Sequence, residues 1–162
     1  MDVFVTGGTG YIGRPLIGGL TGRGHSVAAL VRAGSERKLP AGVRSVVGDA
    51  VRAETFAGHV APAKTFVQLV GVSHPSPAKA AEFRSVDLAS VRASADAAAR
   101  AGVEHFVYLS VAQPAPAIMK EYAAVRAEGE AIVRATGMNA TFLRPWYVLG
   151  PGHRWPYLLL PA

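Results

Sequence analysis

The sequence predicts an α/β fold in which a doubly wound parallel sheet lies between two layers of helices. Apolar runs of strand length alternate with longer segments of helical period along the chain, and this alternation is typical of βαβ units. Most of the short runs are continuous stretches of Val, Leu and Phe, as expected for strands buried on both faces. A glycine-rich turn also follows the first of these runs directly.

The predicted strands are the apolar runs that end at polar or turn-forming residues. They are residues 3–6, 26–31, 43–47, 65–70, 105–110 and 140–143. Because crossovers between parallel strands are right-handed, we expect the strand order 3-2-1-4-5-6.

The helices are expected between these strands. The first begins near Tyr11 and ends by the Gly22-Arg23-Gly24 turn, and two short crossovers follow over 35–39 and 53–59. The longest helix is predicted over 77–101, closed by Gly102, and another over 118–135, closed by Gly137.

Length and composition predict a single domain over residues 1–162. Half of the 162 residues are apolar, which suffices for a full core. The absence of cysteine excludes disulfides, thiolate chemistry and a Cys-based zinc site, and it suits a reducing, cytoplasmic location. We expect no secretory signal and no membrane span, since no apolar run approaches the roughly 20 residues that a bilayer requires. The five histidines lack metal-binding spacing, so no metal is expected.

The chain is basic, with a formal charge of +6 and a pI of about 10.1. Such a balance suits nucleic acid, an anionic membrane surface or a phosphorylated ligand. The arginines are spread singly, without a basic run or interleaved aromatic residues, so only charge supports nucleic-acid binding and we expect none. Only Arg32, Arg37 and Lys38 form a locally dense group.

The turn from Thr6 to Gly13 reads TGGTGYIG and fits the dinucleotide-binding fingerprint, with the first glycine at either Gly7 or Gly8. Glycine permits a positive φ, close approach of the backbone to a pyrophosphate, and close packing of helix on strand. The turn follows a strand, opens a helix and heads a βαβ unit, which favours dinucleotide binding by a Rossmann-type domain over a purely structural glycine turn. The cofactor-binding candidates in the turn are Gly7, Thr9, Gly10, Tyr11 and Ile12.

The end of the second predicted strand indicates which dinucleotide binds. NAD-specific domains place an acidic residue there, on the ribose 2′-hydroxyl. This chain has Arg32, whose guanidinium suits a 2′-phosphate, and Arg37 or Lys38 can add a second positive contact. The sequence therefore favours NADP over NAD, unless Arg32 is only a solvated residue at the strand end.

With this loop in place, the chain resembles the short-chain dehydrogenase/reductase superfamily, in its extended and atypical branches that include NmrA-like proteins. The similar segments are residues 6–13, 47–49, 69–72, 98–110, 143–145 and 150–152. The resemblance implies that Asp49 contacts adenine, that Val70 and Gly71 pack against the adenosine half, and that Pro145 lies beside the nicotinamide. Asp49 is equally suited to form a turn, and Pro145 to end a strand.

The resemblance also implies a catalytic helix, although this chain departs from the family's motif at one position. The family uses Tyr-x-x-x-Lys, and this chain has Tyr122 followed four residues later by Arg126. The spacing puts both side chains on one helical face. In the family, the tyrosine protonates a carbonyl while the cation holds the nicotinamide ribose, and Ser110 is the candidate third partner. Arginine cannot relay a proton, so Tyr122 and Arg126 also fit an ordinary stabilising pair.

The resemblance further implies a substrate-binding portion after the sixth strand, where this chain has only the short segment 150–162. Its apolar part, 155–160, is expected to fold over the cleft, to join two subunits in a homodimer, or to mark a chain cut short. The leading function is an NADP-dependent oxidoreductase that reduces a small carbonyl or enone. The rival is a non-catalytic module that senses NAD(P) or serves as an accessory NAD(P)-binding protein.

Overall fold

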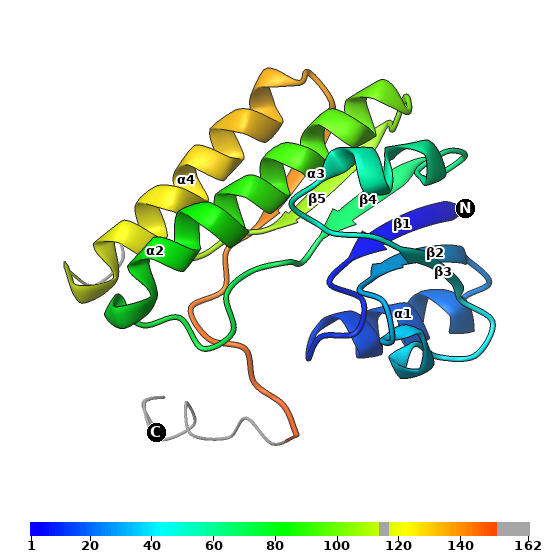
Figure 1. Cartoon of the computed structure of the whole chain (residues 1–162), viewed down its shortest axis with the longest axis horizontal. Helices are drawn as coiled ribbons and strands as arrows, with labels where there is room; N and C mark the ends of the chain where they lie inside the picture. Colours follow the sequence, from blue (N-terminus) through cyan, green and yellow to red (C-terminus); the bar gives the residue numbers. More distant parts are fainter. Residues whose placement is uncertain (114–116, 152–162) are drawn as a thin grey trace.

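Six parallel strands form one sheet in the order β3-β2-β1-β4-β5-β6, as predicted. The computed structural model describes residues 1–113 and 117–151 (Figure 1). The strands are β1 (Asp2–Thr6), β2 (Ser26–Val31), β3 (Arg44–Val47), β4 (Thr65–Gln68), β5 (His105–Leu109) and β6 (Asn139–Leu143). Residues 152–162, which include the apolar stretch predicted over 155–160, lie outside the described part of the chain.

The fourth strand is shorter than predicted. It ends at Gln68, and Val70 and Gly71 belong to the loop that follows. The Val70 N–H donates to the Gln68 side-chain carbonyl oxygen at 3.1 Å, so the chain turns away from the sheet there. The expected residues of the adenosine half therefore lie at the carboxyl edge of the sheet, beside the loop after β1.

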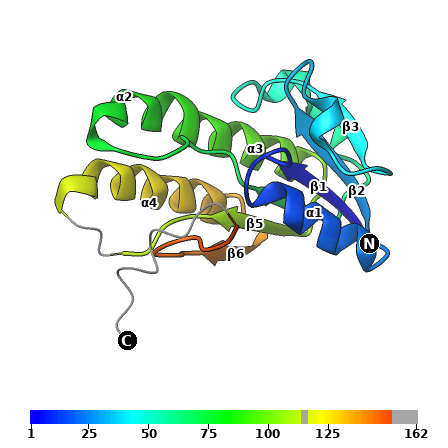
Figure 2. The ribbon, with the colours of Figure 1, turned by 90° about the horizontal axis from the view of Figure 1, so that it is seen from below.

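Helices cover both faces of the sheet (Figure 2). On one face α1 (Gly13–Gly22) packs on β1 and β2, with Ile17 at the centre of a small apolar cluster. On the other face the larger cluster joins α3 (Ala89–Arg100) and α4 (Lys120–Ala135) to the strands. The rings of Phe4, Phe66 and Phe106 are paired in register across β1, β4 and β5, with neighbouring ring centroids 5.2 Å apart.

The helix predicted over 77–101 has the expected extent, but the expectation of one continuous helix is wrong. It consists of η4 (Pro77–Lys79), α2 (Ala80–Glu82), a π-helical stretch η5 (Phe83–Leu88) and α3. Within the π-helical stretch, the side chain of Asp87 is buried and accepts a hydrogen bond from the Val72 N–H in the loop after β4. π-helical turns are frequent at functional sites.

The remaining connections lie close to the positions predicted from the sequence. The two short crossovers contain the 3-10 turns η1 (Glu36–Lys38), η2 (Ala53–Thr55) and η3 (Ala57–His59), and η6 (Ala117–Met119) precedes α4. Helix α1 begins two residues later than expected, at Gly13. Gly102 and Gly137 have φ angles of 70° and 75°, which confirms that glycines close the two long helices. Within the described residues, we find no helix both long and apolar enough to cross a bilayer.

Candidate functional site

The turn between β1 and α1 meets the geometric demands of a phosphate-binding loop. Gly7 has a φ of 74°, and the Gly10 N–H donates to the Gly7 carbonyl oxygen at 3.0 Å. A Cβ at Gly13 would collide with the Gly7 carbonyl oxygen and the backbone of Gly8, so glycine is required where the helix packs on the turn. Thr9, Tyr11 and Ile12 complete the turn, which leads into the N-terminus of α1, where helices favour anionic groups.

Gly10 differs from the other two glycines because its position is exposed. A Cβ there would meet only the Gly7 carbonyl oxygen, at 3.1 Å. The fold therefore tolerates a side chain at Gly10, whereas a pyrophosphate lying on the turn would not.

We expect Gly10→Val to abolish NADPH binding while the protein remains folded, because the added side chain occupies the space over the turn. Fluorescence titration and circular dichroism measure the two properties. Gly18→Val, on the open surface of α1 where a Cβ meets nothing within 4 Å, is the matched control and should bind normally. Unchanged affinity in folded Gly10→Val would exclude this turn as the site.

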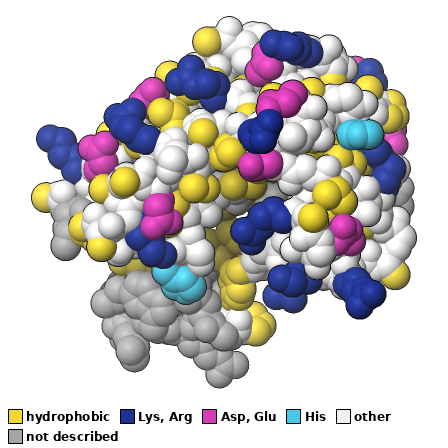
Figure 3. Space-filling model, viewed as in Figure 1, with side chains coloured by type: hydrophobic (Ala, Val, Ile, Leu, Met, Phe, Trp, Pro, Cys, Tyr) yellow, Lys and Arg dark blue, Asp and Glu magenta, His cyan; other side chains and the backbone are white. Residues whose placement is uncertain are grey.

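The basic group predicted after the second strand lies at the carboxyl edge of β2. Arg32 follows β2 directly, and Arg37 and Lys38 belong to η1; all three are exposed. In the described part of the chain, no ion pair involves these three side chains. Figure 3 shows Lys and Arg side chains beside a hollow between the α2 end and the β2–β3 end of the molecule.

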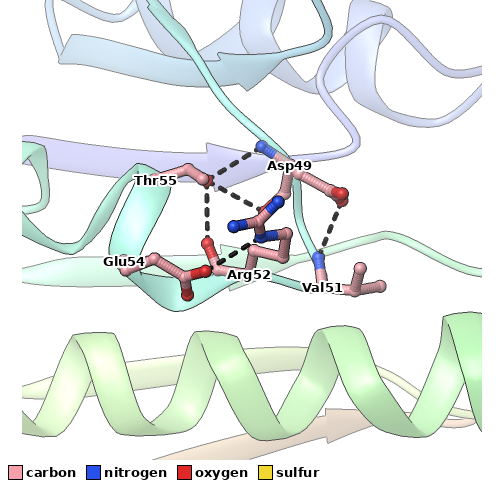
Figure 4. A network of polar contacts seen from close by, with 5 residues as sticks. All are labelled: Asp49, Val51, Arg52, Glu54 and Thr55. Atoms are coloured by element: carbon pink, nitrogen blue, oxygen red, sulfur yellow. Dashed lines mark hydrogen bonds and ion pairs between the residues drawn. The ribbon is translucent and has the colours of Figure 1, made fainter.

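Asp49 forms a turn at the carboxyl end of β3 (Figure 4). Its Oδ1 accepts the Val51 N–H at 3.1 Å, and its own N–H donates to the Thr55 hydroxyl at 2.9 Å. The Thr55 hydroxyl in turn donates to the Arg52 carbonyl oxygen at 2.7 Å. The turn-forming role of Asp49 is therefore present, and its exposed carboxylate is still available for the predicted contact with adenine.

Arg126 is buried and paired with a carboxylate that the sequence did not indicate. Its Nη2 lies 2.5 Å from Asp87 Oδ1, and its Nη1 donates to the Leu109 carbonyl oxygen at 2.8 Å. Only 5% of the Arg126 side chain is exposed, and none of the Asp87 side chain. Burial raises the pKa of Asp87, while Arg126 and the Val72 N–H, which donates to Oδ2 at 2.9 Å, oppose the rise.

This ion pair fixes the loop after β4. A Cβ at Gly71 would collide with Arg126 Nη2, so glycine is needed for the guanidinium to reach Asp87. Gly71 thus has a packing role in the structure, and its predicted contact with the adenosine half is a separate, untested expectation.

The structure brings Tyr122 and Arg126 together, as the spacing predicted. The guanidinium carbon of Arg126 lies 5.1 Å from the centroid of the Tyr122 ring. The ring is half-buried and packs at 5.0 Å against Phe83 of the π-helical stretch. The centroid of the Tyr108 ring lies 5.8 Å from the same guanidinium carbon, and burial raises the pKa of the Tyr108 phenol. The pair therefore belongs to a larger buried group rather than to one helix surface.

Ser110 lies in a different polar cluster, around Glu130 of α4. Glu130 Oε1 accepts from Arg144 Nε at 2.7 Å, and Oε2 accepts from Arg134 at 2.8 Å. The Ser110 hydroxyl is close enough to help lower the pKa of Glu130, although no regular hydrogen bond joins the two. The Ala112 N–H donates to the Pro145 carbonyl oxygen at 3.1 Å, which holds the segment after β6 beside the end of β5.

The Glu130 cluster predicts a pH-dependent stability. The hydrogen bond from Arg144 is the largest cause that lowers the pKa of Glu130 from 4.5 to about 2, against the opposing effect of burial. A carboxyl with a lowered pKa stabilises the fold above its unfolded pKa and loses this contribution as the pH falls through its folded pKa. We expect roughly 3 kcal/mol of unfolding free energy to be lost between about pH 5 and pH 2. Denaturant titrations should show a smaller loss in Glu130→Gln; an equal loss would contradict the assignment.

A buried chain of hydrogen bonds leads from the phosphate-loop strand to Asp87. The Thr6 hydroxyl donates to Gln68 Oε1, and Gln68 Nε2 donates to the Ser90 hydroxyl at 2.9 Å. The Ser90 hydroxyl donates to the Asp87 carbonyl oxygen at 3.1 Å. Sequence reasoning missed these residues; the one available signal is a carboxylate at position 87 with a serine, Ser90, one turn later on the same helical face.

A groove of about 580 Å³ lies outside the expected dinucleotide cleft, between the turn after β3 and the helix η5–α3. Its lining includes Val51, Leu88 and three arginines. Each arginine pairs with a carboxylate: Arg84 with Glu121 and Glu128, Arg92 with Glu128, and Arg100 with Asp96. Within the described chain, no three His, Asp or Glu side chains are grouped to hold a metal ion.

Comparisons with known proteins show the family to which the chain belongs. The sequence model of a family described as NAD(P)H-binding matches residues 7–153. The chain belongs to this family. It is 33% identical to a 3-diazoavenalumate denitrifying reductase of Streptomyces sp, over 94% of this chain and 58% of the relative. It is 30% identical to a ceramide reductase of Caulobacter vibrioides, over 93% of this chain and 47% of the relative.

This member of the NAD(P)H-binding family thus spans about half the length of the curated relatives it matches. Among solved structures, it resembles MoeE5 in complex with UDP-glucuronic acid and NAD, with a TM-score of 0.77 and 23% identity over 96% of this chain and 57% of that one. It also resembles the Thermus thermophilus UDP-glucose 4-epimerase complex with NAD, with a TM-score of 0.75 and 22% identity over 89% and 54%. These likenesses confirm the Rossmann fold, and together with the reductase relatives they confirm the resemblance to the short-chain dehydrogenase/reductase superfamily.

Proposed function

We propose that this chain binds NADPH and that Tyr122 protonates the oxygen of a carbonyl or enone substrate as it is reduced. The observation that carries the proposal is the position of Tyr122, half-buried beside the Arg126 guanidinium on the helix that follows β5. NADPH, when bound, supplies the hydride that the carbonyl carbon accepts. The Tyr122 hydroxyl delivers the proton, and solvent then restores it.

The residues present fit the cofactor. No Cβ covers the backbone at the exposed Gly10, where a pyrophosphate would lie, and Gly13 lets the N-terminus of α1 pack closely on the turn. The names of the matched relatives support reduction chemistry: a denitrifying reductase, a ceramide reductase and a ketoreductase of Stigmatella aurantiaca that acts on a farnesylated quinoline oxide.

We further propose a preference for NADP over NAD, because Arg32 is exposed, unpaired in the described chain, and located at the end of β2. Arg32→Ala is expected to weaken NADPH binding by about 1.5–3 kcal/mol, the range for a hydrogen bond to a charged group, and to leave NADH binding unchanged. The matched control in the same fluorescence titrations is Arg23→Ala, which removes an exposed arginine at the C-terminal end of α1, away from the phosphate loop. Equal losses for both nucleotides would overturn the assignment.

One observation favours a second candidate, a module that binds NADP without turnover. The Arg126 guanidinium is held by Asp87 and the Leu109 carbonyl oxygen, so its polar groups are turned into the protein rather than toward a ribose. Titration with NADPH followed by a panel of carbonyl compounds separates the candidates. Binding with turnover supports the reductase, binding without turnover supports the module, and the absence of binding excludes both.

A further inference from the structure

Residues 146–150, here called the strap, cross from the end of β6 to the phosphate loop. At one end, the Ala112 N–H holds the Pro145 carbonyl oxygen and Glu130 binds the Arg144 guanidinium. At the other end, Gly150 packs so closely on the Tyr11 hydroxyl that a Cβ would collide with it. The strap is therefore attached at both ends and borders the proposed cofactor site.

The strap is apolar and exposed. Trp146 is 61% exposed, Leu149 39% and Tyr147 44%, and Tyr11 on the phosphate loop is 42% exposed. Residues 145–151 contain no charged side chain. Exposed apolar surface that adjoins a functional site commonly binds a ligand, and aromatic side chains provide large contact area for hydrocarbon groups.

We propose that the strap binds the hydrocarbon part of the substrate, so that the preferred substrate is a ketone or enone carried on an apolar chain rather than a small one. This inference rests on the proposed reductase function. The strap offers no cation for a phosphorylated or carboxylated substrate, whereas each methylene buried on apolar surface strengthens binding about fourfold.

Calorimetric titration of the 162-residue chain tests this inference, with saturating NADP and a series of straight-chain 2-ketones from four to eight carbons. We expect affinity to rise about threefold to fourfold with each methylene. Trp146→Ala should reduce this increment. Val47→Ala, which truncates an exposed apolar residue of β3 at the opposite end of the sheet, is the matched control and should retain it.

The possible failures are distinguishable. If NADPH binds but affinity is independent of chain length, the strap assignment is overturned while the proposed function survives. If Trp146→Ala converts a dimer into a monomer in sedimentation and leaves the increment unchanged, the strap is a contact between copies and the assignment also fails. If NADPH does not bind, both proposals fall.

Discussion

Tyr122→Phe is expected to lower NADPH-dependent turnover by about 10²–10⁴-fold, the usual contribution of a general acid, with NADPH affinity nearly unchanged. The substitution removes the transferable proton but keeps the ring that packs on Phe83 at 5.0 Å and lies 5.1 Å from the Arg126 guanidinium. Steady-state kinetics with a single ketone measure the loss as kcat. Equal turnover in parent and variant would leave Tyr122 with a packing role alone.

Arg126→Lys complements this experiment because it restores the cation used by the resembled enzymes. A lysine keeps a positive charge opposite Asp87 but cannot reproduce both contacts of the guanidinium, to Asp87 and to the Leu109 carbonyl oxygen. We expect activity to be preserved or raised and stability to fall. A collapse of activity in a folded variant would show that the arginine itself is required.

Asp87→Ala is expected to lower the free energy of unfolding by about 3–5 kcal/mol, because it leaves the buried Arg126 guanidinium without its counter-charge. Chemical denaturation measures the change. Asp96→Ala on α3 is the matched control: its pair with Arg100 is exposed, and its loss should cost less than about 1 kcal/mol.

A double variant tests the cause of that loss. If the penalty comes from an uncompensated charge, Asp87→Leu combined with Arg126→Met should be more stable than Asp87→Ala, since neither polar group is then buried alone. If Asp87→Ala costs no more than Asp96→Ala, the ion pair does not hold the site together.

The sheet could be predicted because its signals are local. Continuous apolar runs identified the strands to within one or two residues, and right-handed crossovers fixed their order. The break in the long helix could not be predicted, because helical period alone does not distinguish an α-turn from a π-turn. The π-helical stretch contains Asp87, whose partner Arg126 lies on another helix.

In the site, too, features set by neighbouring residues could be predicted, and features set by residues distant in the sequence could not. The phosphate loop is one short segment, and the demands at Gly7 and Gly13 follow from its spacing. The i,i+4 spacing also brought Tyr122 and Arg126 together correctly. The direction of the guanidinium depended on Asp87, which is distant in the sequence, and spacing carries no information about such a partner. The ion pair between Glu130 and Arg144 was missed as well, because the spacing of these two residues does not indicate that they meet.

The buried hydrogen-bond chain through Thr6, Gln68, Ser90 and Asp87 has a consequence for local opening of the molecule. Because it ties the end of β1 to the π-helical stretch, and Asp87 ties that stretch to α4, neither region can open without breaking buried polar contacts in the other. The Val72 amide, which donates to Asp87, should exchange its hydrogen only as fast as the whole unit opens. A ligand seated on the phosphate loop should therefore slow exchange at an amide it does not touch.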